Sequence, residues 1–72
     1  SLYPSPAKNE LKISAENKID TASIYNILGR KVKSFSVNAK TSSLDVSSLS
    51  TGIYILKYIS NNVVGSMKFI KE

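Results

Sequence analysis

Apolar and polar residues alternate in short blocks along the chain, and no block keeps a helical period over three turns. In the first block Leu11 and Ile13 alternate with polar neighbours, which predicts a strand with both side chains facing inward. Residues 16–18 are polar and are expected to form a turn before a second strand at about residues 21–25. Gly29 then suits a turn that requires a positive φ angle.

The middle of the chain shows the same alternation with one change of parity. A third strand is expected over residues 30–37, where the apolar residues change face, so we expect a bulge or break near Ser34. Residues 38–42 are polar and are expected to form a loop. Leu44 and Val46 then alternate with polar residues, which predicts a short fourth strand.

The last third of the chain carries the strongest strand signal. Residues 47–52 are rich in hydroxyl side chains and end in a glycine, which predicts a turn. Residues 53–60 are β-branched and aromatic, so they are expected to form a central strand. The side chains expected to face the core from this strand are Tyr54, Leu56 and Tyr58. Asparagines at 61–62 are expected to close a hairpin, because asparagine tolerates the left-handed conformation, and residues 63–71 to pair as its second strand with a bulge at Gly65.

Six to seven short strands at this spacing predict an all-β fold, a compact antiparallel β-sandwich of immunoglobulin type, with a small barrel as the alternative. With 72 residues the chain is too short for two hydrophobic cores, so we expect one domain over residues 1–72. Within it residues 1–8 are expected to be an extended N-terminal segment. The reason is that Pro4 and Pro6 lack a backbone donor and push the preceding residues toward extended geometry.

The composition removes most catalytic chemistry. The chain contains no cysteine, histidine or tryptophan, which excludes disulfide scaffolds, metal sites built on histidine or cysteine, and triads with a histidine base. The five acidic residues show no Asp-x-Asp calcium pattern, and acids such as Asp20 and Asp45 more commonly cap nearby backbone amides. The three glycines are too dispersed to cradle a phosphate. We therefore expect no enzyme, no cofactor and no metal site.

Charge and aromatic content favour a solvated surface over a nucleic-acid or sugar site. Lysine and arginine outnumber the acids by 10 to 5, for a net charge of +5, but only residues 30–33 cluster. Such spacing favours a solvated surface over nucleic-acid binding. No apolar run is long enough to predict a transmembrane segment. Tyr25, Tyr54 and Tyr58 have two interpretations, an aromatic platform for sugars or, the one expected here, large strand residues half-buried in the core.

Four blocks of residues, in this order, resemble the type A C-terminal sorting domain of the type IX secretion system, which is found on exported proteins of Bacteroidetes. The blocks are Tyr3-Pro4-Ser5-Pro6 before Leu11-Lys12-Ile13, Ile24-Tyr25-Asn26 before Gly29-Arg30-Lys31-Val32, the run from Asp45-Val46-Ser47 through Leu49 to Gly52-Ile53-Tyr54-Ile55-Leu56-Lys57, and Lys68-Phe69-Ile70-Lys71. The family has asparagine where this chain has Ser5, which is a mild departure because serine keeps the turn chemistry.

The resemblance implies a non-catalytic signal at the C-terminus of a secreted parent protein. In the family the outer-membrane translocon reads the domain after the parent reaches the periplasm. A sortase-like cysteine peptidase then usually removes it, and the cargo is released or kept at the cell surface. A cut upstream of the domain would here fall before or near Tyr3.

The expected recognition surface is the last strand together with the strand that begins at Gly52, with lysines steering toward an acidic receptor patch. The residues assigned to it are Gly52, Tyr54, Lys57, Lys68, Phe69, Ile70 and Lys71. A second set is expected to shape the fold and comprises Tyr3, Pro4, Pro6, Gly29, Asp45 and Leu49. The alternative function is a small immunoglobulin-like accessory or carbohydrate-binding module of a secreted enzyme or adhesin, which requires an exposed row of tyrosines.

Overall fold

The computed structural model describes residues 2–3 and 6–72, and in that part of the chain every regular element is a strand. The all-β prediction is therefore confirmed. The strands are β1 (Leu2–Tyr3), β2 (Glu10–Asn26), β3 (Lys31–Asp45), β4 (Gly52–Ser60) and β5 (Val63–Lys71).

All five strands belong to one antiparallel sheet in which β2 is the organising strand. One edge of β2 pairs with β3 along most of its length. The other edge pairs with β1 near its start and with β4 near its end, and β5 lies outside β4. The predicted central position of β4 is confirmed.

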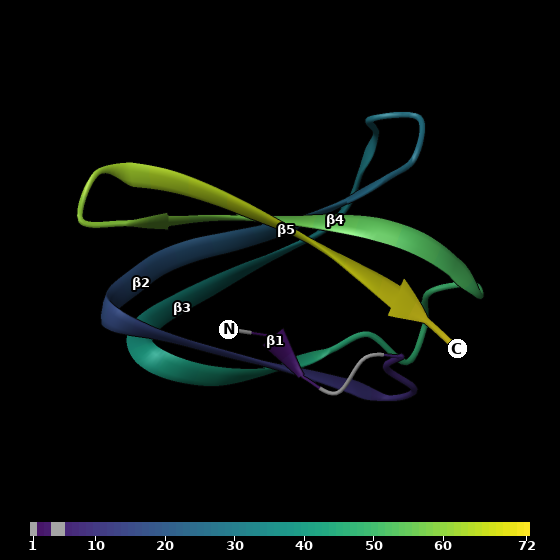
Figure 1. Ribbon diagram of the computed structural model, residues 1–72, viewed down its shortest axis with the longest axis horizontal. Helices are drawn as coiled ribbons and strands as arrows, with labels where there is room; N and C mark the ends of the chain where they lie inside the picture. Colours follow the sequence, from purple (N-terminus) through teal and green to yellow (C-terminus); the bar gives the residue numbers. More distant parts are fainter. Residues whose placement is uncertain (1, 4–5) are drawn as a thin grey trace.

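The sheet folds over on itself because β2 and β3 bend together halfway along their length (Figure 1). Residues 10–14 and 41–45 form the lower layer of Figure 1 with β1, and residues 19–25 and 31–39 form the upper layer with β4 and β5. Buried apolar side chains from both layers meet in one core between them. These are Ala7, Leu11, Ile13, Ile19, Ala22, Ile24, Leu44, Val46, Tyr54, Leu56 and Phe69.

The expected count of six to seven short strands is not confirmed, because two predicted chain breaks are bends within long strands. The predicted turn at residues 16–18 lies inside β2, and the predicted loop at 38–42 lies inside β3. The β2–β3 register shifts between Ser14 and Ile19, where both strands bend, and Asn38 has a φ of 51°. Continued pairing between the two strands prevails over the local turn preference of these polar residues.

The irregularity predicted near Ser34 is present two residues away, and the bulge predicted at Gly65 is absent. Ser34 pairs in register with Ser23, and the irregularity falls at Val32 instead, since Ile24 pairs with Lys33 and Tyr25 with Lys31. Around Gly65 the β4–β5 register is unbroken.

Gly65 has a packing role instead of a bulge. It lies opposite Tyr58, whose ring occupies the space where a Cβ atom at position 65 would lie. Only glycine leaves room for the tyrosine ring at this point.

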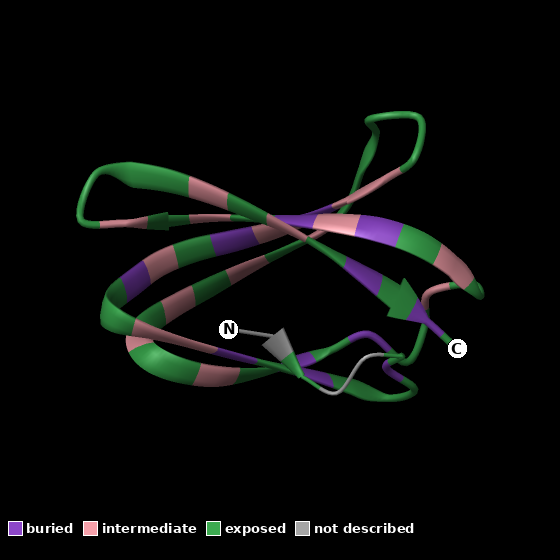
Figure 2. Ribbon diagram, viewed as in Figure 1, coloured by how far each residue is buried: buried purple, intermediate pink, exposed green. Residues whose placement is uncertain are grey.

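The two hairpin turns follow the sequence expectation and are exposed at opposite ends of the molecule (Figure 2). Gly29 has a φ of 82°, and Asn61 and Asn62 have φ angles of 53° and 62°. Positive φ at both central residues characterises the two-residue turn that matches the twist of paired strands. Inward-facing Tyr54 and Leu56 are buried, and Tyr58 packs against the core, as predicted.

The segment around Ala7 joins the end of β5 to the lower layer. Ala7 is fully buried, its backbone N–H donates to the carbonyl of Ile70 (2.8 Å), and its carbonyl accepts from the N–H of Glu72 (2.7 Å). Two residues later the carbonyl of Asn9 accepts from the N–H of Val46 (2.9 Å). These bonds fix the C-terminal end of β5 against the rest of the sheet.

Candidate interaction surface

Strand alternation gives β4 and β5 a solvent-facing side that we call the outer face. Residues at odd positions of β4 and even positions of β5 face outward, since their neighbours in sequence carry the buried side chains. The outer face comprises Ile53, Ile55, Lys57, Ile59, Val64, Ser66, Lys68 and Ile70. Five of these eight side chains are apolar, and a contiguous exposed apolar patch is typical of an interaction surface.

Cross-strand pairs order the outer face from end to end. Ile53 lies opposite Ile70 and Ile59 opposite Val64, so aliphatic pairs occupy both ends. Lysines occupy the middle, where Lys57 lies opposite Ser66 and Lys68 lies opposite Ile55. All charges in this set are positive, and an apolar surface with lysines only fits an acidic, partly apolar partner.

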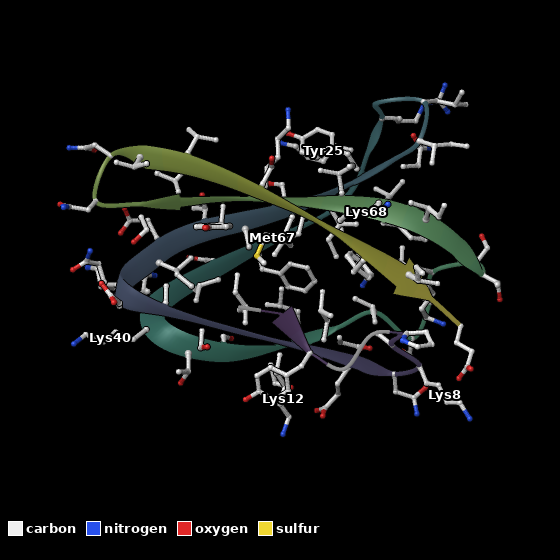
Figure 3. The ribbon with its side chains drawn as sticks, in the orientation of Figure 1. Lys8, Lys12, Tyr25, Lys40, Met67 and Lys68 are labelled. Atoms are coloured by element: carbon white, nitrogen blue, oxygen red, sulfur yellow. The ribbon has the colours of Figure 1, made fainter. Side chains whose placement is uncertain are left out.

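Tyr25 of β2 extends this surface. It pairs with Ile55, and the Nζ of Lys57 lies 5.0 Å from the centroid of its ring, a cation–π geometry. Figure 3 shows Tyr25 and Lys68 on the side of the upper layer away from the core, whereas Met67 extends between the layers. Beside Tyr25 an open hollow of about 440 Å³ is lined in part by Ile53 and by Ile27 of the β2–β3 turn.

The predicted recognition residues divide into an exposed and a buried group. Lys57, Lys68 and Ile70 are exposed on the outer face. Tyr54 and Phe69 are buried on the opposite side of the same strands, where their rings stack with centroids 5.7 Å apart. The structure therefore does not bring the two groups onto one surface.

Gly52 and Lys71 pair at the end of the β4–β5 ladder, next to the buried aromatic stack. The side chain of Lys71 is enclosed, and its Nζ donates to the backbone carbonyl of Glu72 (3.0 Å). Near it an exposed ion pair joins Lys8 and Glu72 at 3.7 Å. Lys71 thus lies buried at the end of the β4–β5 ladder and not on the outer face.

The residues expected to shape the fold lie at turns and at the lower layer. Asp45 accepts hydrogen bonds from the Ser47 hydroxyl (2.6 Å) and backbone N–H (3.0 Å), and these bonds lower the pKa of its carboxyl. Leu49 is half-buried against the core, and its N–H donates to the Val46 carbonyl (3.1 Å). From β4, the Tyr54 hydroxyl donates to the carbonyl of Ser50 (2.8 Å), which lies in the same turn as Leu49.

The N-terminal members of that set are placed less completely. Tyr3 pairs with Lys12 in the β1–β2 ladder and has an exposed side chain, and Pro6 is also exposed. Pro4 lies outside the described residues.

The tyrosines do not form an exposed row. Of the three tyrosines considered for such a row, Tyr54 is buried, Tyr58 turns inward over Gly65, and Tyr25 faces outward, half-buried beside Lys57. An aromatic platform for sugars requires coplanar exposed rings, so the carbohydrate-binding alternative is not supported.

Sequence reasoning missed the isoleucines of the outer face. Ile53, Ile55 and Ile59 share the face of Lys57 by strand parity, and that alternation is visible in the sequence. The expected site included Lys57 from this face but not its three isoleucines.

No helix in the described chain is long and apolar enough to cross a membrane. Among residues 2–3 and 6–72, the acidic side chains form no group of three that could hold a metal ion.

Comparison with known families identifies the chain. Residues 1–72 match the family model described as the secretion system C-terminal sorting domain. The chain therefore belongs to the family of C-terminal sorting domains of the type IX secretion system. A search of the curated proteins found no match.

Proposed function

We propose that the domain is a non-catalytic signal that directs a parent protein, attached to its N-terminal side, through the outer-membrane type IX translocon. The parent would be in the periplasm during transit and then at the cell surface or outside the cell. The observation that carries the proposal is the family match over residues 1–72, which includes every strand of the fold.

The outer face provides the contact surface in this proposal. Lys57 and Lys68 steer the domain toward an acidic patch of the translocon, because complementary charge raises the rate of encounter over a range of about 8 Å at physiological salt. Ile53 and Ile70, paired at one end of the face, then supply apolar contact that excludes water.

The buried members of the predicted set have an indirect part. Tyr54, Phe69 and Lys71 hold β5 against β4, so that the exposed side chains of the same strands keep a fixed spacing. A change at Phe69 would thus disturb recognition by loosening the fold, whereas a change at Lys68 would act on the contact itself.

We further propose that a sortase-like cysteine peptidase cleaves the parent upstream of Tyr3. The β1 strand, which ends at Tyr3, pairs with β2, so a cut before β1 leaves the folded domain intact. Removal after transport would free the cargo without unfolding the signal.

The test is a reporter protein with an ordinary inner-membrane export signal and residues 1–72 at its C-terminus, produced in a bacterium with a working type IX system. The expected result is reporter outside the cell, and reporter trapped in the periplasm when the translocon gene is deleted. Reporter left in the periplasm of both strains would contradict the sorting function. In a strain without the peptidase, secreted reporter should keep the 7.9 kDa domain.

A further inference from the structure

We propose that the translocon binds this domain by strand addition to the outer edge of β5, the edge that faces away from β4. The bound segment would be an extended, acidic and partly apolar segment of the translocon. This inference rests on the proposed sorting function and specifies how the contact is made.

The direction of the β5 backbone groups follows from one hydrogen bond. The Ile70 carbonyl accepts from Ala7, which lies on the side of β5 opposite to β4. Backbone groups of successive strand residues point alternately to the two sides, so Val64, Ser66 and Lys68 also direct their N–H and C=O groups to the outer edge.

These groups have no partner in the described chain. Within the described chain β5 pairs with β4 and, at its C-terminal end, with Ala7, and no other backbone hydrogen bond reaches residues 64–68. The β4–β5 register runs from Ser60–Val63 to Gly52–Lys71 without a bulge, so the edge is regular. A regular strand with unpaired backbone groups is a template for an added strand.

The β3 edge of the sheet is less regular than the β5 edge. Its pairing with β2 is interrupted at Val32, and again beside Asn38, which has a positive φ. Bulges twist an edge away from a neighbour, and exposed Lys31 and Lys40 add charge along the strand. The β3 edge is thus regular only in shorter runs, of which residues 41–45 are one, whereas the register of β5 is unbroken over residues 63–71.

Charge and side chains select the class of segment that binds. The side chains of Val64, Ser66 and Lys68 share the outer face, so an added strand would place its own side chains beside an aliphatic group, a hydroxyl and an ammonium group. An acidic residue beside Lys68 and an apolar one beside Val64 fit this order. A second copy fits poorly, because each copy carries a net charge of +5.

The experiment uses proline, which removes a backbone donor and places its ring in the way of an added strand. Ser66→Pro changes a residue whose N–H has no partner in the described part of the chain, and Ser66→Ala controls for the hydroxyl. Ser43→Pro is the matched change on the β3 edge. The Val46 N–H points toward the β2 side, because it donates to the Asn9 carbonyl, and successive residues of β3 point alternately to the two sides. The N–H of Ser43, three residues earlier, therefore points away from β2.

Each variant is tested in the reporter fusion, and its thermal unfolding is followed by circular dichroism. Ser66→Pro should lower secretion about tenfold or more while unfolding near the wild-type temperature, and Ser66→Ala and Ser43→Pro should secrete normally. If Ser66→Pro is unstable, Val64→Pro takes its place.

Three outcomes would overturn the proposal and leave the sorting function standing, because the wild-type fusion would still be secreted. One is a stable Ser66→Pro variant secreted within about twofold of Ser66→Ala. Another is a purified domain that forms dimers which Ser66→Pro dissociates, because the edge would then take a second copy. The last, which needs no variant, is a Ser66 amide that exchanges with solvent as slowly as that of Met67 in the free domain.

Discussion

Phe69 provides the clearest test of whether one side of β5 stabilises the fold while the other side is available for contact. Its ring is only 1% exposed and stacks on Tyr54 in the centre of the core. Its neighbour Ile70 lies on the outer face and is 45% exposed. The two residues are adjacent in the same strand, so Phe69→Ala and Ile70→Ala form a matched pair of truncations.

The expected loss of stability differs several-fold between the two variants. Removing a fully buried phenylalanine costs about 3–5 kcal/mol, including the cavity it leaves. Truncating Ile70 removes about half as much buried surface and opens no internal cavity, so it should cost less than about 1 kcal/mol. A domain of this size has about 4–11 kcal/mol of total stability, so Phe69→Ala removes a large share of it.

Urea unfolding followed by far-ultraviolet circular dichroism measures the difference. With a slope of about 1 kcal/mol per M for a small domain, Phe69→Ala should move the midpoint down by about 3 M or more, and Ile70→Ala by less than about 1 M. Equal shifts for the two variants would refute the division of β5 into a core side and a contact side.

Three further predictions concern local features of the fold. Gly65→Ala should destabilise the domain by about 1–3 kcal/mol through its clash with the Tyr58 ring, and in a Tyr58→Ala background the cost should fall below about 1 kcal/mol, as a double-mutant cycle would show. Asn62→Ala should lower the thermal midpoint, at a cost of about 1–2 kcal/mol for its left-handed backbone, whereas Asn62→Gly should not. Hydrogen bonds from Ser47 hold the pKa of Asp45 below its ordinary value, so their contribution to stability is complete above that value and is lost as the pH falls through the lowered pKa. Asp45→Asn should remove this part of the acid dependence in unfolding curves recorded from neutral to acid pH.

Strand faces could be predicted from the sequence because the period of two is a local property. Leu11 and Ile13, then Tyr54 and Leu56, are buried as their alternation indicated. The hairpin at Asn61–Asn62 followed from side-chain chemistry, since few residues adopt positive φ easily. Features that depend on one strand or one turn could thus be predicted from the sequence.

The joining of short strands into long ones could not be predicted in the same way. Polar residues at 16–18 and 38–42 resemble turns, and only the pairing of β2 with β3 shows them to be bends in continuous strands. The burial of Phe69 depends likewise on its register opposite Tyr54. In the sequence, Phe69 and Ile70 are two adjacent apolar residues, and nothing local says which of them faces the core.

The central claim is that the sorting signal is the outer face of a folded domain, and charge reversal tests it most directly. Lys57→Glu with Lys68→Glu alters the outer face, while Lys12→Glu with Lys40→Glu alters exposed lysines elsewhere, on β2 and β3 (Figure 3). Each Lys→Glu change replaces a positive charge with a negative one and lowers the net charge by two, so both pairs lower it from +5 to +1. The secreted fraction of the reporter should fall sharply for the first pair and stay near wild type for the second. Equal secretion by the two variants, with both domains folded, would contradict the account.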